Sequence, residues 1–338
     1  MISIYGTVYN NGYALQQSLD SLISTLNNVE LDYEIVIVDN YSTDNTWKIL
    51  EEYKKKIPHR FKIYRAKCSR GKGRDLALRR TSGEYVMYVD FDCLFSRRFG
   101  YMIKSILGII KRDEIWNNGL TYRDTMINIV NGWSDLNMCE DYDMNIRAVL
   151  KGIKLKHVMI QKPYKNIRKT GKIVGEERYA RNRFDKFLRV LRLRRDALLG
   201  CNLNCKYFAM MTDGFIPKII GCSIIKAFKL IYRNRLKHSY LHRNNLLAFE
   251  FIYDKINLVP PEIIGFDPHD LLYVFRMVNI THSSVINKVK QLYNNIKDIK
   301  IAIFNKNIII YRDKEVLDNY LSYYSENHEP IKYFKIIK

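Results

Sequence analysis

The sequence predicts an α/β fold in which helices cover a mainly parallel sheet. Short apolar runs at 33–38 and 83–89 and an alternating run at 2–9 have the length and residue types of buried strands. Between them, residues 13–26 and 46–54 carry apolar side chains at helical spacing. Strands that alternate with helices favour a parallel sheet covered on both faces.

The remaining elements follow in chain order. We expect a strand at 61–65, a loop running into a helix at 71–80, helices at 99–111 and 142–150, a strand at 155–160 and a hairpin at 301–311. Residues 120–130 fit either a helix or a strand. The chain of 338 residues is long enough for more than one domain. We divide it into a sheet domain at 1–165, a basic helical extension at 166–240 and a small α+β tail at 241–338.

The charge of the chain is concentrated in one block. The formal net charge is +21, and residues 151–240 hold 23 Lys and Arg against 5 Asp and Glu. Such a block attracts a polyanion, an anionic membrane surface or a phosphorylated substrate. The alternative is a solvated surface without a partner.

Other features concern the compartment. No run of eighteen uncharged apolar residues is present, so a membrane-spanning helix is not expected. The first residues lack the layout of a signal peptide. The six cysteines are scattered, and Cys201 and Cys205 have no zinc-site spacing, so we interpret them as packing residues. A mostly reduced, cytoplasmic protein is the expectation.

Polar residues follow the predicted strands. Thr7, Asn10, Asp39 and Asp90 stand at strand ends, and ligands of parallel sheets bind outside the carboxyl ends of the strands. The carboxylate of Asp39 has the chemistry to accept from a base N–H or a ribose hydroxyl, or to cap the helix that begins after Ser42.

Asp90 and Asp92 are the candidate metal ligands. Residues two apart in an extended chain point the same way, so both carboxylates can face one cation. Mg²⁺ and Mn²⁺ favour such oxygen ligands together with phosphate oxygens. The alternative is two solvated aspartates at a strand end.

Two further segments carry charge at a helix start. Arg70-Gly71-Lys72-Gly73-Arg74 combines cations suited to phosphate with glycines that let the backbone approach a ligand, although a basic surface turn explains it equally. Glu140-Asp141 supplies a candidate general base, or a helix N-terminal acid pair.

Together these segments resemble glycosyltransferase family 2, whose members have the GT-A fold. The matching pieces are TVYN at 7–10, IVIVDNYSTDNT at 35–46, RGKGRDLALRRTSGEYVMYVDFD at 70–92 and NGWSDLNMCEDYDMNIRAVLKG at 131–152. They stand in the family's order and cover residues 1–165, about half of the chain.

The resemblance implies a role for each position. It places Thr7, Asn10 and Asp39 around the nucleoside, and Arg70, Lys72, Arg74 and Asp75 beside the phosphates and sugar. Asp90 and Asp92 match the D-x-D pair that holds Mn²⁺ or Mg²⁺ and the donor diphosphate. Trp133 and Asp135 belong to the acceptor-side loop. Asp141, with Glu140 beside it, matches the general base of inverting transfer.

The implied function is an inverting, metal-dependent transferase for a single sugar. The donor is a UDP-, GDP- or dTDP-sugar, and the acceptor is a glycan, lipid-linked or protein hydroxyl or phosphate. The Q-x-x-R-W motif of processive members is absent, and Asp75 stands where the family usually has Asn.

Two other classes remain open. A basic nucleic-acid-binding protein explains the basic block but not the ordered acidic segments. A nucleotidyltransferase needs a glycine-rich loop after the first strand, where this chain has only Gly12. The helices expected at 179–199 and 215–232 have apolar stripes and cations, which fits either packing on the sheet domain or peripheral contact with an anionic membrane.

Overall fold

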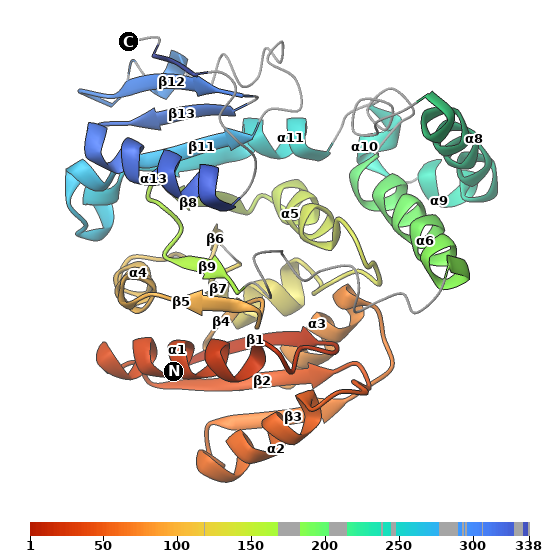
Figure 1. Cartoon of the computed structure of the whole chain (residues 1–338), viewed down its shortest axis with the longest axis horizontal. Coiled ribbons are helices and arrows are strands. Elements are labelled where there is room, and N and C mark those ends of the chain that lie inside the picture. The colour runs from red at the N-terminus through yellow and green to blue at the C-terminus, as the bar shows by residue number, and fades with distance from the viewer. Residues whose placement is uncertain are drawn as a thin grey trace.

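The structure is a computed structural model of the whole chain. It describes residues 1–117, 119–167, 183–202, 215–237, 239–244, 248–276, 290–292, 294, 296–305, 307–327 and 334–336. Figure 1 shows a sheet near the N-terminus, a second strand-rich region near the C-terminus, and a group of helices to one side.

A five-stranded sheet organises the N-terminal region, in the order β3-β2-β1-β4-β7. Its strands are β1 (Ile2–Val8), β2 (Tyr33–Asp39), β3 (Phe61–Arg65), β4 (Tyr85–Tyr88) and β7 (Thr121–Tyr122). The first four pair in parallel and β7 is antiparallel. The chain moves outward from β1 to β3 and returns to the other side of β1 as β4. The strand order therefore reverses between β1 and β4, where ligands of such sheets bind.

Helices cover both faces of this sheet. One face holds α1 (Leu15–Asn28), α2 (Thr46–Lys56) and α4 (Arg97–Leu107), and the other holds α3 (Arg70–Arg79) and α5 (Glu140–Leu150). Alternate residues of β2 serve the two cores: Ile35 and Ile37 pack on the first face, and Val36 and Val38 on the second. The predicted α/β fold class is confirmed.

Further strands form smaller sheets. β6 (Glu114–Trp116), β8 (Lys154–Val158) and β10 (Ile256–Val259) pair in parallel, and β5 (Cys93–Phe95) pairs with β9 (Tyr164–Asn166). The ambiguous segment 120–130 contains β7 and a π-helical turn, Thr125–Ile129. Because β10 pairs with β8, the chain after 240 continues a sheet begun before 165. The domain boundaries at 165 and 240 stay predictions.

The C-terminal sheet is antiparallel, in the order β11-β13-β12-β14. Its strands are β11 (Leu272–Arg276), β12 (Lys300–Phe304), β13 (Asn307–Tyr311) and β14 (Phe334–Ile336), and α13 (Lys314–Asn327) packs on β13. The hairpin predicted at 301–311 is confirmed as β12–β13. Short 3₁₀ turns at Pro261–Ile264 and Pro268–Asp270 precede this sheet.

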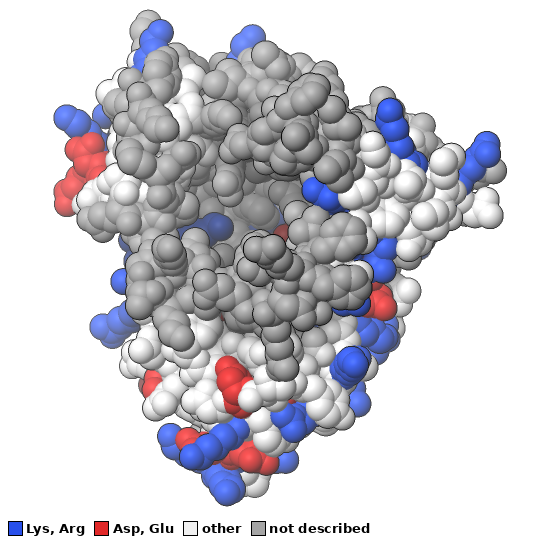
Figure 2. All heavy atoms as spheres, turned by 45° about the vertical axis from the view of Figure 1, so that its right-hand side comes forward, with Lys and Arg blue, Asp and Glu red and all other residues white. Residues whose placement is uncertain are grey.

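Within the expected extension at 166–240, the described residues include α6 (Arg183–Cys201), α8 (Phe215–Ile231) and α9 (Arg233–Lys237). The helices α10 (Tyr240–Arg243) and α11 (Ala248–Lys255) follow, and all are drawn in green to cyan in Figure 1. The extension as a separate unit stays a prediction. Residues 179–182 of the predicted helix lie outside the described residues. Figure 2 brings this side forward and shows Lys and Arg on it. Within the described ranges, no helix is long and apolar enough to cross a membrane.

His157 of β8 makes the stability of the fold depend on pH. Burial, and then the charge of Lys162, lowers the pKa of this imidazole to about 4, against about 6.5 in an unfolded chain. Between these values the unfolded state binds a proton that the folded state does not. We expect the contribution of His157 to the free energy of unfolding to be fully present above about pH 6.5. As the pH drops to about 4, the free energy of unfolding should fall by about 1–3 kcal/mol.

Urea unfolding at pH 7.5 and pH 4.5 tests this expectation, with His157→Gln as the comparison. Gln is uncharged at both values, so the variant should lose less stability than the original chain. Equal losses in the two proteins would show that His157 does not contribute.

Candidate active site

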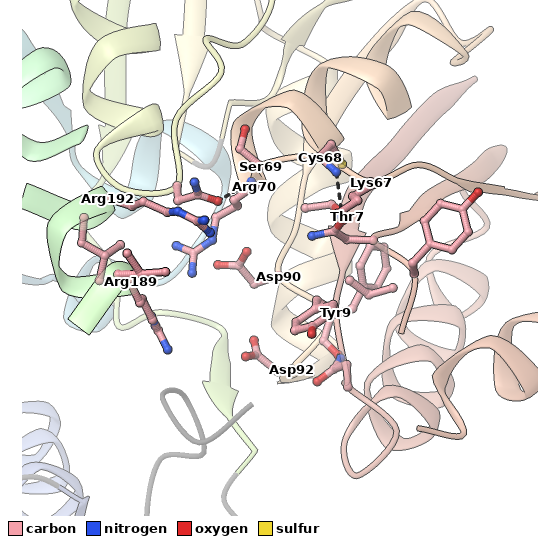
Figure 3. Close-up of a pocket in the computed structure, with 18 of the residues that line it drawn as sticks. Thr7, Tyr9, Lys67, Cys68, Ser69, Arg70, Asp90, Asp92, Arg189 and Arg192 are labelled. Atoms are coloured by element: carbon pink, nitrogen blue, oxygen red, sulfur yellow. Dashed lines mark hydrogen bonds between the residues drawn. The ribbon is translucent and has the colours of Figure 1, made fainter. Parts of the chain in front are cut away.

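A cavity of about 1170 Å³ opens at the point where the strand order of the first sheet reverses. Residues at the end of β1, in the segments that follow β1 to β4 and at the start of α3 line one side, and the loop before α5 and helix α6 line the other (Figure 3). From the sheet side come Thr7, Val8, Tyr9, Asn11, Asn40, Tyr41, Lys67, Cys68, Ser69, Arg70, Asp90, Phe91 and Asp92. From the opposite side come Asn137, Leu188, Arg189, Arg192, Leu193 and Arg195.

Asp90 and Asp92 both line this cavity, on the turn between β4 and β5. Figure 3 shows both carboxylates reaching into the space between the sheet and α6. The side chain of Asp90 is 61% exposed even though it pairs with Arg74. Two accessible carboxylates on one turn are a donor set that suits Mg²⁺ or Mn²⁺. In the described part of the chain, no group of three or more His, Cys, Asp or Glu is arranged to hold a metal. A metal here would need further oxygen ligands from substrate or water.

Arg74 is buried beside Asp90 and pairs with two carboxylates. Its guanidinium is 4% exposed and donates to Oδ1 of Asp90 at 2.7 Å and to Oε1 of Glu140 at 2.9 Å. It also lies 4.6 Å above the ring of Tyr88 and 5.0 Å above that of Trp133. Burial by itself lowers the pKa of Arg74, but the charges of Asp90 and Glu140 raise it above its ordinary value. Arg74 therefore orients Asp90 and links β4 to α5.

The glycines of the 70–74 segment have a packing role that was not predicted. The segment is the first turn of α3, capped by Ser69, whose hydroxyl accepts from Lys72 N. Gly71 N donates to Leu136 O, and a Cβ at Gly73 would lie 2.5 Å from Thr7 Oγ1. The glycines allow α3 to pack closely on β1 and on the loop before α5. The expectation that they also bring backbone near a ligand stays a prediction.

Of the other residues expected beside the phosphates, one lines the cavity and two do not. Arg70 lines the cavity and lies 3.5 Å from Glu140. Lys72 and Asp75 pair with each other and do not line the cavity. Asp75 is buried and also pairs with Arg79.

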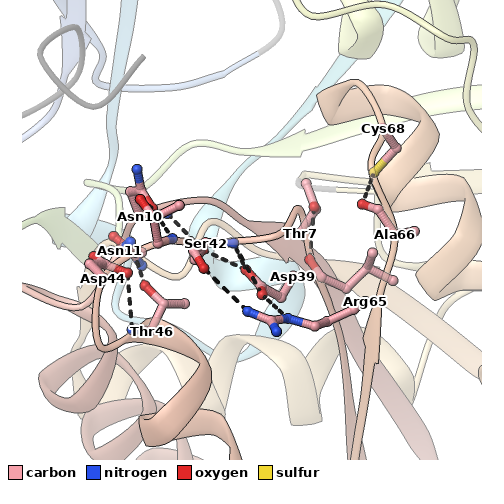
Figure 4. Close-up of polar contacts among 12 residues, drawn as sticks. Thr7, Asn10, Asn11, Asp39, Ser42, Asp44, Thr46, Arg65, Ala66 and Cys68 are labelled. Carbon is pink, nitrogen blue, oxygen red and sulfur yellow. Dashed lines mark hydrogen bonds and ion pairs between the residues drawn. The ribbon is translucent and has the colours of Figure 1, made fainter. Parts of the chain in front are cut away.

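On the nucleoside side, Thr7 lines the cavity and donates to Val38 O at 2.9 Å. Asp39 is fully buried and accepts from Ser42 and from Arg65 Nε, the latter at 2.9 Å (Figure 4). The side-chain oxygen of Asn10 accepts from Thr43 N. Asn10 and Asp39 do not line the cavity, whereas their neighbours Asn11 and Asn40 do. The nucleoside role of Asp39 stays a prediction.

The acceptor-side residues lie around the N-terminus of α5. Trp133 is 4% exposed and its indole N–H donates to Tyr5 Oη, so this side chain belongs to the core. Asp135 is exposed and accepts from Ser69 Oγ. Glu140 is buried against Arg74, while Asp141 is partly exposed and accepts from Tyr142 N. The roles of Trp133, Asp135, Glu140 and Asp141 stay predictions.

Helix α6 is the part of the site that the sequence did not reveal. Its basic, amphipathic pattern predicted a helix but not a position beside the aspartates. A disulfide between Cys139 and Cys201 joins the end of α6 to the residue before Glu140. The interpretation of Cys201 as an unpaired packing residue is therefore wrong, because the fold brings together two cysteines 62 residues apart. Cys68 lines the cavity, and burial raises the pKa of its thiol to about 11, which keeps it mostly protonated near neutral pH.

Comparison with known proteins places the N-terminal region in a family. Residues 3–108 match "Glycosyl transferase family 2". Poly(ribitol-phosphate) beta-glucosyltransferase of Bacillus spizizenii is 42% identical over 93 residues, which are 27% of this chain and 14% of that protein. Poly(ribitol-phosphate) beta-N-acetylglucosaminyltransferase TarS of Staphylococcus aureus is 32% identical over 93 residues, 27% of this chain and 16% of that protein. The matched segment thus spans about a seventh of the length of these relatives.

Residues 1–349 of S. aureus TarS in complex with UDP-GlcNAc align with a TM-score of 0.41 and 18% identity, covering 78% of this chain and 82% of that one. The family match confirms the resemblance drawn from the motifs at Thr7–Asn10, 35–46 and 70–92. Residues 3–108, which cover most of β1 and all of β2 to β4 of the N-terminal sheet, are therefore similar to the glycosyltransferase family 2 domain.

Proposed function

We propose that the chain is an inverting, metal-dependent glycosyltransferase that moves a single sugar from a nucleotide-sugar to a hydroxyl or phosphate acceptor. The observation that carries the proposal is the position of Asp90 and Asp92 within a family 2 domain. Both carboxylates line the cavity at the point where the strand order reverses. This is where a parallel sheet binds nucleotides.

The donor fits the sheet side of the cavity. In the proposal, Thr7, Tyr9 and Tyr41 lie around the nucleoside, and Lys67 and Arg70 lie beside the diphosphate. Asp90 and Asp92 would hold Mn²⁺ or Mg²⁺, and the bound ion would stabilise the charge of the departing diphosphate. Arg74 fixes the orientation of Asp90 from below. The base, whether of a UDP-, GDP- or dTDP-sugar, is left open.

The acceptor is activated by proton removal. In the proposal, Asp141 takes the proton of the attacking hydroxyl, and Glu140 holds the start of α5 through Arg74. The hydroxyl oxygen forms a bond to the anomeric carbon while the bond to the diphosphate breaks on the opposite face. The configuration of the sugar is therefore inverted.

The names of relatives support transfer of a sugar to an acceptor, but they do not decide which molecule the acceptor is. Four of them are named for poly(ribitol-phosphate), two for poly-beta-1,6-N-acetyl-D-glucosamine and one for dolichyl phosphate. Glycan, lipid-linked and protein acceptors all remain within the proposal.

A thermal-shift panel tests the function. UDP-, GDP- and dTDP-sugars are compared with and without Mn²⁺, because a ligand that binds only the folded state raises its stability by mass action. We expect one nucleotide class to raise the melting temperature in the presence of Mn²⁺. If none of the three does so, the proposed function is wrong.

We further propose a cytoplasmic location with peripheral membrane contact. Leu230 and Ile231 at the end of α8 are 76% and 69% exposed, and Lys226 and Lys229 are exposed beside them. An apolar tip flanked by cations suits an anionic bilayer surface.

The protein should sediment with anionic vesicles, not with neutral ones, and salt should release it. Leu230→Ser with Ile231→Ser should weaken the binding. Steeply salt-dependent binding to duplex DNA without vesicle binding would instead favour a nucleic-acid partner.

A further inference from the structure

Helix α6 forms the wall of the cavity that faces the two aspartates. Leu188, Arg189, Arg192, Leu193 and Arg195 all line the cavity from this helix. Positions 188, 192 and 195, like 189 and 193, are three or four apart and share a side of the helix. Figure 3 shows Arg189 and Arg192 reaching toward the space that holds Asp90 and Asp92.

This wall is fixed to the rest of the site at its C-terminal end. The Cys139–Cys201 disulfide and the hydrogen bond from Asn137 N to Asp196 Oδ2, at 2.7 Å, join α6 to the loop before α5. A Cβ at Gly200 would lie 3.0 Å from Cys139 O, so the helix approaches this loop closely. Asp196 is fully buried. The position of Arg189 and Arg192 is therefore set by the fold and not by a loose segment.

The cavity carries more positive charge than is needed to bind a metal-bound donor. Among the described residues that line it, five are cationic (Lys67, Arg70, Arg189, Arg192 and Arg195) and two are carboxylates. Arg195 pairs with Asp196 and Arg70 approaches Glu140. A divalent metal and a diphosphate carry opposite charges of similar size. With a metal-bound donor on the sheet side, the cations of α6 still favour a second anion across the cavity.

Guanidinium groups define the chemistry of that anion. Arg binds phosphate through two parallel N–H···O bonds, which a hydrated ammonium does not do. Arg192 is exposed and Arg189 partly exposed, so both are accessible from the cavity. Resting on the proposed function, we propose that Arg189 and Arg192 bind a phosphate group of the acceptor, and that the acceptor is therefore a phosphate-bearing molecule.

The test compares two probes in the presence of UDP and Mn²⁺. One is an oligomer of glycerol phosphate, and the other is an uncharged glycerol oligomer of the same length. The original chain should bind the first and not the second. Arg189→Gln and Arg192→Gln should each weaken binding of the phosphate oligomer by about ten- to a hundredfold, the usual effect of a charged hydrogen bond. UDP affinity and the melting temperature should change little.

A matched control removes the same number of charges elsewhere. Lys54→Gln with Lys55→Gln deletes two exposed cations of α2 that do not line the cavity, and oligomer binding should stay within twofold. Equal binding by the arginine variants, or no binding by the original chain, overturns the proposal. Loss of UDP binding in these variants, with oligomer binding intact, would assign the arginines to the donor and also overturn it. Failure of the original chain to bind any nucleotide with Mn²⁺ is a separate result, which contradicts the proposed function alone.

Discussion

Asp141→Asn is expected to lower the rate of sugar transfer by about 10²–10⁴-fold, the usual contribution of a positioned base. Asn keeps the shape of the side chain and removes its ability to take a proton. Asp141 is partly exposed at the first turn of α5. The fold and the affinity for the nucleotide-sugar should therefore be preserved. Steady-state transfer rates, together with calorimetric donor binding, measure both effects.

Glu140→Gln is the matched comparison, and it should act through the fold. Glu140 is 3% exposed and accepts from Arg74 at 2.9 Å, so the substitution leaves the buried guanidinium with a weaker partner. The melting temperature of Glu140→Gln should therefore fall, whereas that of Asp141→Asn should not. If the Asn variant keeps most of its activity while a folded Gln variant is inactive, the base is Glu140. If both stay active, the base lies elsewhere, and Asp135 is the next candidate.

Arg74→Gln is expected to destabilise the protein by about 3–5 kcal/mol, as when one partner of a buried ion pair is removed. The substitution leaves the buried carboxylate of Glu140 without its main cation and removes a cation from above Tyr88 and Trp133. Urea unfolding measures the change in the free energy of unfolding.

Arg79→Gln is the control, on the same helix. Arg79 is 45% exposed and pairs with Asp75 at 3.0 Å. A pair that is open to solvent contributes about 0–1 kcal/mol. A loss of less than 1 kcal/mol in Arg74→Gln would show that the guanidinium does not hold β4 and α5 together.

Local patterns in the sequence predicted the sheet and the edge at which the site lies. The run at 33–38 and the alternating run at 2–9 have a periodicity that depends only on neighbouring residues. The ends of β1 and β4 meet at one edge because parallel strands share their direction. Asp90 and Asp92 were found in this way.

Residues whose surroundings come from distant parts of the chain could not be predicted. The buried pairing of Arg74 with Glu140 was not predicted, because the two residues are 66 positions apart in the chain. The pairing of Asp39 with Arg65 was not predicted, because it depends on the register of β2 against β3. The position of α6 depends on the contact between Cys139 and Cys201. No local sequence pattern indicates which helix will line a cavity formed by distant segments.

Calorimetric titration of UDP and GDP with either Mn²⁺ or EDTA tests the central claim most directly. The claim is that Asp90 and Asp92 hold a metal that binds the diphosphate, since without metal the diphosphate meets two carboxylates. The account predicts at least tenfold tighter binding with Mn²⁺ for one nucleotide, and loss of that gain in Asp92→Asn. Equal affinity with Mn²⁺ and with EDTA, for every nucleotide that binds, would contradict it.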